Sequence, residues 1–277
     1  MSYDSIVVER HDAGFATLTL NRPEQLNTLS MHMRQEMAQA IVALQRDAVR
    51  VLILTAKGRA FTAGLDLDEW RADGTSDGTS DGTSHGASDG PSDAPIAAGA
   101  YLFDPVAALQ GFEGVVIGAI NGMAITGGLE IALACDVLIA SSSARFADTH
   151  ALVGLLPGWG GSVRLVRRVG LLRAKEMALT GRVLTAADAL AWGLVNQVVP
   201  PDQLLAAAEA MAQQMLAAVP GTLKDYKRLL DEVAALPMDA ALRHERAASV
   251  ACNASVERSV LLERLAALRQ RQRASEG

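Results

Sequence analysis

The clearest candidate for chemistry is a glycine-containing turn that ends in a glutamate. The run Asn121-Gly-Met-Ala-Ile-Thr-Gly-Gly-Leu-Glu follows an apolar segment typical of a buried strand, and Gly127 and Gly128 begin a predicted helix. The first N–H groups of a helix have no partners within it and lie at the positive end of its dipole. Such a place stabilises an anion, including a developing oxyanion. Glu130 adds a carboxylate there, although a helix N-terminus also simply favours glutamate.

A second turn of small residues, Gly58-Arg-Ala-Phe-Thr-Ala-Gly-Leu-Asp-Leu, follows another apolar segment. Small residues let a ligand approach the main chain closely. The same pattern occurs in ordinary strand-to-helix connections, so neither turn identifies an activity by itself.

Apolar patterning predicts the elements that position these turns. A helix is predicted from about Ser30, because apolar residues between Met33 and Leu44 recur at helical spacing. Buried strands that alternate with helices predict a layered α/β domain. The short apolar or alternating runs predicted to be strands are residues 5–9, 15–20, 51–54, 115–120, 137–140 and 195–199.

The chain changes character near residue 200 and becomes almost wholly helical, with later helices predicted at about 221–235 and from 238 onward. Such helices must bury their apolar faces on the body or on another subunit. We therefore predict a core, 1–200, and a C-terminal helical oligomerisation region, 201–277. The first apolar stripe of that region is Leu204, Leu205, Ala208, Met211, Ala212 and Met215.

Residues 73–93 form an acidic insert of low complexity. Residues 73–92 are five tetrads, DGTS three times and then HGAS and DGPS. Small polar residues bury too little surface to become ordered, so we expect a flexible insert. Calcium binding by its Asp-Gly repeats is the alternative, since calcium prefers carboxylate oxygens. The insert holds five Asp and neither Lys nor Arg, so the 31 acids and 25 bases of the chain leave a net charge of −1 outside it.

Composition excludes several classes of protein. The 277 residues carry a net charge of −6, which is unsuited to neutralising nucleic-acid phosphates. Two distant cysteines, Cys135 and Cys252, argue against a disulfide scaffold or a zinc module. The N-terminus lacks signal-peptide character, and no apolar run approaches the ~20 residues of a membrane span. We expect a cytoplasmic protein with no nucleic-acid or membrane partner.

Five ordered motifs together resemble the crotonase superfamily, which contains the enoyl-CoA hydratases and isomerases. The resemblance covers nearly the whole chain and implies an α/β fold, a crotonase-like spiral of ββα units with a C-terminal helical trimerisation region. Its motifs are Asn21-Arg-Pro-Glu-Gln-Leu-Asn, Phe61-Thr-Ala-Gly-Leu-Asp-Leu with the run ending in Glu130, Ala144-Arg-Phe-Ala, Gly154-Leu-Leu-Pro-Gly-Trp-Gly-Gly, and Leu179-Thr-Gly followed by Ala189-Leu-Ala-Trp-Gly-Leu-Val-Asn-Gln-Val-Val-Pro.

The resemblance implies that an acyl-CoA thioester binds as substrate, with no separate cofactor and no metal, in a homotrimer or a dimer of trimers. In the family, two backbone N–H groups hold the thioester oxygen in an enolate-like state. By motif position these belong to Leu65 and Gly127, and removing one such donor typically costs about 10²–10³ in rate. For the candidate contact Lys227, a solvated helix charge is an equal alternative. The implied CoA contacts are Leu26, Ala63, Asp66, Leu67, Asp68 and Lys227.

The sequence departs from the family at one catalytic position. Hydratases of the family use two glutamates, which activate water and deliver a proton to the α-carbon. Glu130 matches the first, but His150 stands four residues after Phe146, where the second belongs. An imidazole titrates near neutral pH and can transfer the proton, and Asp148 and Thr149 are near enough in sequence to orient it. The alternative is an ordinary hydrogen-bonded loop histidine.

We therefore predict a hydratase-type lyase that adds water to a trans-2-enoyl-CoA. Glu130 would activate the water, His150 would assist proton transfer, and the amides of Leu65 and Gly127 would form the oxyanion hole. Enoyl-CoA isomerisation or other enolate chemistry with one glutamate, and acyl-CoA binding without turnover, stay open as alternatives. Trp159, where the family often has a small residue, is interpreted as packing between loop and helix rather than as narrowing the acyl pocket.

Overall fold

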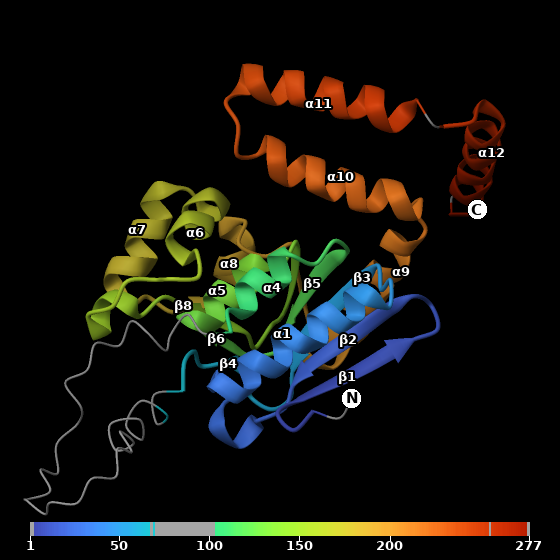
Figure 1. Cartoon of the computed structure of the whole chain (residues 1–277). Coiled ribbons are helices and arrows are strands. Elements are labelled where there is room, and N and C mark those ends of the chain that lie inside the picture. The colour runs from blue at the N-terminus through green and yellow to red at the C-terminus, as the bar shows by residue number, and fades with distance from the viewer. Residues whose placement is uncertain (1–2, 67–68, 70–102, 255, 276–277) are drawn as a thin grey trace, which may run out of the picture. The chain divides into compact units, whose positions relative to one another are not determined.

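The computed structural model describes residues 3–66, 69, 103–254 and 256–275 (Figure 1). These form two compact units, Met1–Ala218 and Val219–Gly277. The predicted insert 73–93 and two predicted CoA contacts, Leu67 and Asp68, lie outside the described residues. In the part of the chain that is described, no helix is both long and apolar enough to cross a membrane.

The first unit is built on a six-stranded sheet with the strand order β1-β2-β3-β5-β7-β10. β1 and β2 form an antiparallel hairpin that turns at Gly14 (φ +91°), and the other neighbours pair in parallel. β2 and β5 have the predicted bounds, whereas β10 begins two residues after residue 195, where its strand was predicted to begin. The strands are β1 (Ile6–His11), β2 (Phe15–Leu20), β3 (Val51–Ala56), β5 (Val115–Ile120), β7 (Val137–Ser141) and β10 (Gln197–Val199).

Three strands of this sheet each continue into a short strand of a second sheet. β3 leads to β4, β5 to β6 and β7 to β8, and the second sheet has the order β4-β6-β8-β9. A helical segment follows each pair, which is the predicted repetition of ββα units. The short strands are β4 (Ala60–Thr62), β6 (Met123–Ile125), β8 (Arg145–Ala147) and β9 (Leu184–Thr185).

Helices complete the first unit. The predicted helix after Ser30 is confirmed: the Ser30 side chain accepts a hydrogen bond from the Met33 N–H, 3.1 Å, and caps it. The α-helices are α1 (Met31–Arg46), α4 (Pro105–Gln110), α5 (Gly127–Ala134), α6 (Gly161–Val169), α7 (Leu171–Thr180), α8 (Ala186–Trp192) and α9 (Leu204–Leu216). The short 3₁₀ segments are η1 (Pro23–Gln25), η3 (His150–Val153) and η4 (Pro201–Gln203).

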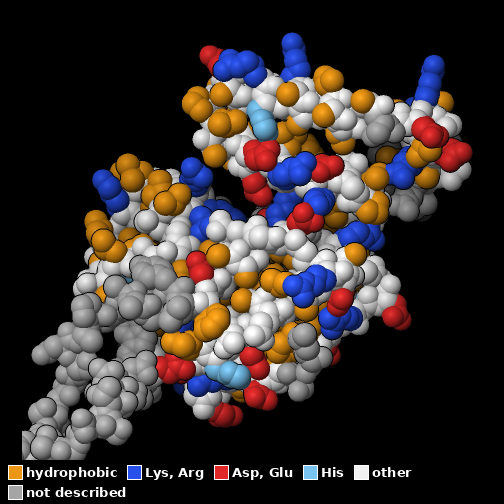
Figure 2. Space-filling view, in the orientation of Figure 1, with side chains coloured by type: hydrophobic (Ala, Val, Ile, Leu, Met, Phe, Trp, Pro, Cys, Tyr) orange, Lys and Arg blue, Asp and Glu red, His pale blue; other side chains and the backbone are white. Residues whose placement is uncertain are grey.

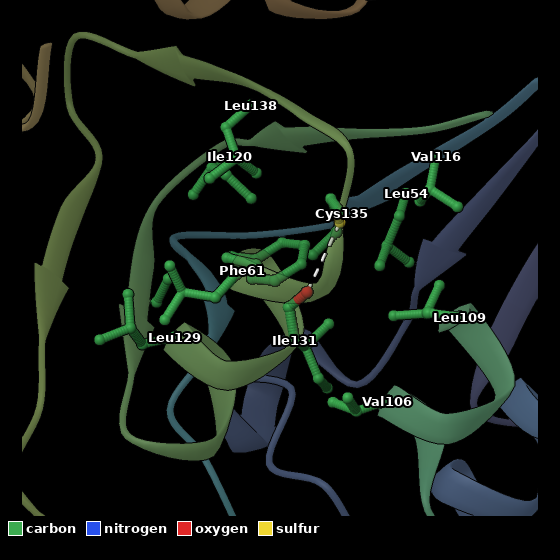
Figure 3. Close-up of a cluster of buried hydrophobic side chains, with 14 of the residues drawn as sticks. Leu54, Phe61, Val106, Leu109, Val116, Ile120, Leu129, Ile131, Cys135 and Leu138 are labelled. Carbon is green, nitrogen blue, oxygen red and sulfur yellow. Dashed lines mark hydrogen bonds between the residues drawn. The ribbon is translucent and has the colours of Figure 1, made fainter. Parts of the chain in front are cut away.

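The core lies on both faces of the first sheet. Alternate residues of a strand point to opposite faces, so Leu52 and Leu54 of β3 join one buried cluster while Val51 and Ile53 join the other. The first cluster includes the apolar faces of α1, α4 and α5, and Figure 3 shows Phe61 of β4 within it. Because buried apolar side chains cover both faces of the sheet, the sequences of the central strands are nearly continuous apolar runs.

Helix α9 belongs to the first unit because it packs on the second face of the sheet. Leu204, Ala208 and Ala212 are buried against strand residues there. The compact units therefore divide after Ala218, later than the boundary predicted after residue 200. The predicted apolar stripe was wrong at Leu205, which is 45% exposed, because it lies about 100° around the helix from Leu204.

The second unit is helical, as predicted. It consists of α10 (Pro220–Val233), α11 (Met238–Asn253) and α12 (Arg258–Ser275), and α10 contacts α11.

Candidate functional site

The N-terminus of α5 is formed by glycines that bring two segments into close contact. A Cβ added at Gly128 would stand 2.3 Å from the carbonyl oxygen of Thr62, so only glycine fits there. Thr126, which precedes the helix, has φ +54° and ψ −109°, and its carbonyl accepts the Glu130 N–H at 3.0 Å. Gly127, the predicted donor, is thus the first residue of a helix whose start is held by close packing against Thr62 and by the hydrogen bond to the Thr126 carbonyl.

The loop that carries Leu65 lies directly over this helix start. A Cβ added at Gly64 (φ +98°) would stand 3.5 Å from the amide nitrogen of Gly127. The Gly64 carbonyl accepts the Leu29 N–H at 2.8 Å, and Leu65 forms an isolated β-bridge with Leu29. Among the described residues, no acceptor takes the N–H of Leu65 or of Gly127. The structure therefore brings the two predicted donors into neighbouring segments.

Glu130 is buried, with 3% of its surface exposed, and one of its oxygens is fixed by backbone donors. Oε1 accepts the N–H of Trp159 at 2.8 Å and the N–H of Gly161 at 2.9 Å. Burial raises the pKa of Glu130 above its ordinary value, and the two N–H groups only partly oppose this. The carboxylate is thus a stronger proton acceptor than an exposed one, with Oε2 free of these two donors.

His150 is also buried and lies beside Glu130, which is the position that the predicted Glu130–His150 pair needs. Its Nε2 stands 3.6 Å from Glu130 Oε2. Its Nδ1 lies 2.7 Å from Asp148 Oδ1, which also accepts the His150 backbone N–H at 3.1 Å. Burial raises the pKa of Asp148, but these hydrogen bonds together outweigh it and hold the pKa below its ordinary value. Asp148 is therefore an ionised acceptor that places the proton on Nδ1 and turns Nε2 toward Glu130.

The Glu130–His150 pair can hold a water molecule. Two atoms 3.6 Å apart can both lie about 2.8 Å from one water oxygen, a normal hydrogen-bond length. A carboxylate and an imidazole that share a water can remove and return its proton. Unused backbone N–H groups in a neighbouring segment can stabilise a negative oxygen as it forms.

The predicted CoA contacts are distributed between the two units. Ala63 donates its N–H to the Leu26 carbonyl at 3.1 Å, so these two segments are joined. Asp66 is buried and pairs with Arg22, Nη1 to Oδ2 3.0 Å, which fixes the end of the Leu65 loop. Lys227 lies on α10, in the second unit. Their contacts with CoA stay predictions.

Sequence reasoning missed the role of Asn27, which holds this site together. Asn27 is fully buried at φ +52° and accepts the Arg22 N–H while donating to the carbonyls of Lys57 and Ala60. The asparagine in the first motif was the available signal, since Asn tolerates positive φ. Trp159 is buried, and its ring carbon lies 3.2 Å from where a Cβ of Gly127 would stand; that it packs rather than narrows an acyl pocket stays a prediction.

Comparisons with known proteins agree with this architecture. The model of the family "Enoyl-CoA hydratase/isomerase" matches residues 10–89 and 97–263. The chain is 35% identical over 247 residues to a probable peroxisomal enoyl-CoA hydratase of Arabidopsis thaliana, covering 89% of this chain and 86% of that protein. It is 34% identical to the short-chain-enoyl-CoA hydratase of Clostridium acetobutylicum, covering 91% and 90%. An enoyl-CoA hydratase structure from Bacillus anthracis superposes with a TM-score of 0.82 at 30% identity, covering 97% of each chain.

Proposed function

The chain belongs to the enoyl-CoA hydratase/isomerase family, and we propose that it adds water to the double bond of a trans-2-enoyl-CoA. The hydratase-type function is supported by relatives of that name that are 34–38% identical over most of the chain. The observation that carries the proposed mechanism is the 3.6 Å separation of Glu130 Oε2 and His150 Nε2. His150 replaces the second glutamate of the family's hydratases at the same motif position.

In the proposed reaction, the thioester oxygen binds the N–H groups of Leu65 and Gly127. Glu130 accepts a proton as the water oxygen bonds to the β-carbon, and the electron pair of the double bond moves to form the enolate. His150, protonated at Nε2 and paired with Asp148, then donates a proton to the α-carbon. The proton held by Glu130 returns to Nε2, so the net change is the addition of one water.

The N–H donors and the paired residues have separate tasks in this scheme. The donors stabilise charge that exists only near the transition state, and losing one typically costs about 10²–10³ in rate. Asp148 stabilises the imidazolium and holds Nε2 toward the water. The proposed CoA contacts, Leu26, Ala63, Asp66, Leu67, Asp68 and Lys227, would bind the part of the substrate that does not react.

Turnover of crotonyl-CoA and longer enoyl-CoAs tests this function. We expect hydration by the wild type and losses of about 10²–10⁴ in kcat for Glu130→Gln and His150→Ala. Unchanged hydration by His150→Ala would remove His150 from the mechanism. Movement of the double bond of a 3-enoyl-CoA without hydration would support the isomerase alternative. Tight acyl-CoA binding with neither reaction would identify a binding protein instead.

We also propose that the protein assembles as a homotrimer or a dimer of trimers. Large apolar side chains are exposed on η3, α6 and α7 and on the loop between η3 and α6, where Figure 2 shows hydrophobic side chains gathered. Leu156 of that loop is 88% exposed and Leu172 of α7 is 82% exposed. Apolar surface of this kind marks an interface. Light scattering should give at least three times the 29.1 kDa chain mass, and Leu172→Glu should lower it. A monomeric wild type would refute the assembly. Location in the cytoplasm stays a prediction.

A further inference from the structure

We propose that the side-chain hydroxyls of Thr126 and Thr149 form a clamp that fixes the position of the Gly127 N–H relative to the His150 imidazole. Both threonines would then be positioning residues for the hydration reaction. This inference rests on the proposed function, because it assigns the clamp to the same oxyanion hole and proton-transfer pair.

The clamp joins two segments that each carry one part of the proposed machinery. Thr126 Oγ1 and Thr149 Oγ1 lie 2.5 Å apart, and Thr126 Oγ1 also lies 3.3 Å from the Thr149 amide nitrogen, which donates to it. Thr126 immediately precedes Gly127, and Thr149 immediately precedes His150. A shift between these two hydroxyls therefore moves the oxyanion donor relative to the imidazole.

The backbone of Thr126 is strained in a way that this contact explains. A β-branched residue rarely adopts a positive φ, and Thr126 has φ +54° with ψ −109°. Such conformations persist only where surrounding contacts fix them, and they occur often at functional sites. Here the Thr126 N–H donates to the Ala147 carbonyl at 2.9 Å, and the hydroxyl bonds to Thr149. The two contacts hold the peptide that presents the Gly127 N–H.

The Thr126 hydroxyl is not used for the more usual purpose of a threonine before a helix. An N-cap side chain ordinarily accepts an N–H of the first helical turn, whereas the Thr126 side chain makes no such capping bond with α5. Its bond instead reaches a residue 23 positions away in the sequence. A contact of this kind contributes to the geometry of the site rather than to the helix end.

Loss of the clamp should affect the transition state more than substrate binding. Small misplacements of reacting groups can cost as much as about 10² in rate. A change that lowers kcat while KM stays nearly constant indicates loss of an interaction made in the transition state. We therefore expect Thr149→Val, which removes the hydroxyl but keeps the shape, to lower kcat for crotonyl-CoA about 10- to 100-fold with KM changed less than about 3-fold.

The test compares Thr149→Val, Thr126→Val, the double variant and the conservative Thr149→Ser in the full-length protein. Thr149→Ser should restore most of the lost kcat. The double variant should be no slower than Thr126→Val, because that variant alone already removes the hydroxyl–hydroxyl contact and the acceptor for the Thr149 N–H. Ser143→Ala is the matched control: it breaks the Ser141–Ser143 hydroxyl pair, 2.7 Å, in the same region but outside the proposed site. Its kcat should equal that of the wild type.

Ligand binding separates failure of the clamp from failure of the proposed function. Thr149→Val should weaken acetoacetyl-CoA, whose enolate carries negative charge on its oxygen, more than butanoyl-CoA, which has no such charge. Wild-type kcat in Thr149→Val, no rescue by serine, or independent effects of the two valine variants would overturn the clamp. If the wild type hydrates no enoyl-CoA, the function fails, and equal weakening of the two ligands would overturn the clamp as well.

Discussion

Gly161 offers a sharp test of how Glu130 is held. It is the first residue of α6, and its N–H is one of the two donors to Glu130 Oε1. A Cβ added at Gly161 would stand 2.9 Å from Glu130 Cγ and 3.1 Å from Oε1. The substitution Gly161→Ala therefore places a methyl group against the carboxylate without removing any polar atom.

The size of the effect follows from the overlap. Carbon atoms in contact ordinarily lie about 3.5–4.0 Å apart, so Glu130 must move by roughly 0.5 Å or more. That movement stretches the 2.9 Å bond from Gly161 beyond the usual range, and it also strains the bond from Trp159. Since misplacement of a catalytic group by about 1 Å can cost 10²-fold, we expect kcat to fall about 10- to 100-fold.

The assay is the loss of ultraviolet absorbance as crotonyl-CoA is hydrated, measured across a range of pH. The two N–H groups oppose the effect of burial on the Glu130 pKa, so weakening them should raise that pKa further. Because the proposed base must be ionised, the acidic limb of the kcat/KM profile should move to higher pH in Gly161→Ala.

Gly221→Ala is the matched control. Gly221 also lies in the first turn of a helix, but nothing stands within 4 Å of its added Cβ. Replacing a helical glycine by alanine can stabilise by about 1 kcal/mol, so this variant should keep wild-type kcat and gain stability. Gly161→Ala with kcat within a factor of two of the wild type and an unmoved pH profile would refute the account of Glu130.

Three further predictions concern stability. The pKa of Glu130 is raised in the folded state, so the stability gained from its neutral form is complete below the unfolded-state pKa and is lost as pH rises through the folded-state pKa. Glu130→Gln should therefore raise the Tm at pH 8 but hardly at pH 4. An equal shift in Tm at both pH values would contradict this. Asn27→Ala should lower the free energy of unfolding, measured in urea, by about 2–4 kcal/mol, because the backbone partners of Asn27 lose buried hydrogen bonds. As a control, Asn253→Ala at an exposed asparagine should change the free energy of unfolding by less than about 0.5 kcal/mol. Deleting residues 73–92 should leave circular dichroism and Tm unchanged and raise the pI; an unfolded product would show that the flexible-insert interpretation is wrong.

Local patterns were sufficient for much of the fold. β2 and β5 are continuous runs of apolar and small residues within turn signals, and their predicted bounds are those observed. β10 begins late because Asn196 bonds to Leu138 through both its backbone and its side chain, and the regular ladder starts only after it. The run itself was sufficient to locate β2 and β5, whereas the start of the edge strand β10 depended on one side chain.

The site was only partly predictable, because its contacts join distant residues. Counting from Phe146 located His150, but its closeness to Glu130 depends on how β8 and η3 follow one another. The bond that His150 Nδ1 donates to Asp148 spans two residues, yet it needs the tight turn that only the structure reveals. The Thr126–Thr149 pair left no local pattern, because its members lie 23 positions apart and Thr149 was noted only as a sequence neighbour of His150.

The connection from Asp66 to Asp104 is secured at both ends by aspartates. At one end, Asp66 pairs with Arg22 and accepts from the Thr28 hydroxyl at 3.0 Å. At the other, Asp104 accepts the N–H groups of Val106 and Ala107 and so begins α4. Because each end is held locally, we expect that changing the length of the insert 73–92 has little effect on either end, since closure entropy grows only slowly with loop length. The insert is therefore a suitable place to graft a tag, a tether or a whole domain.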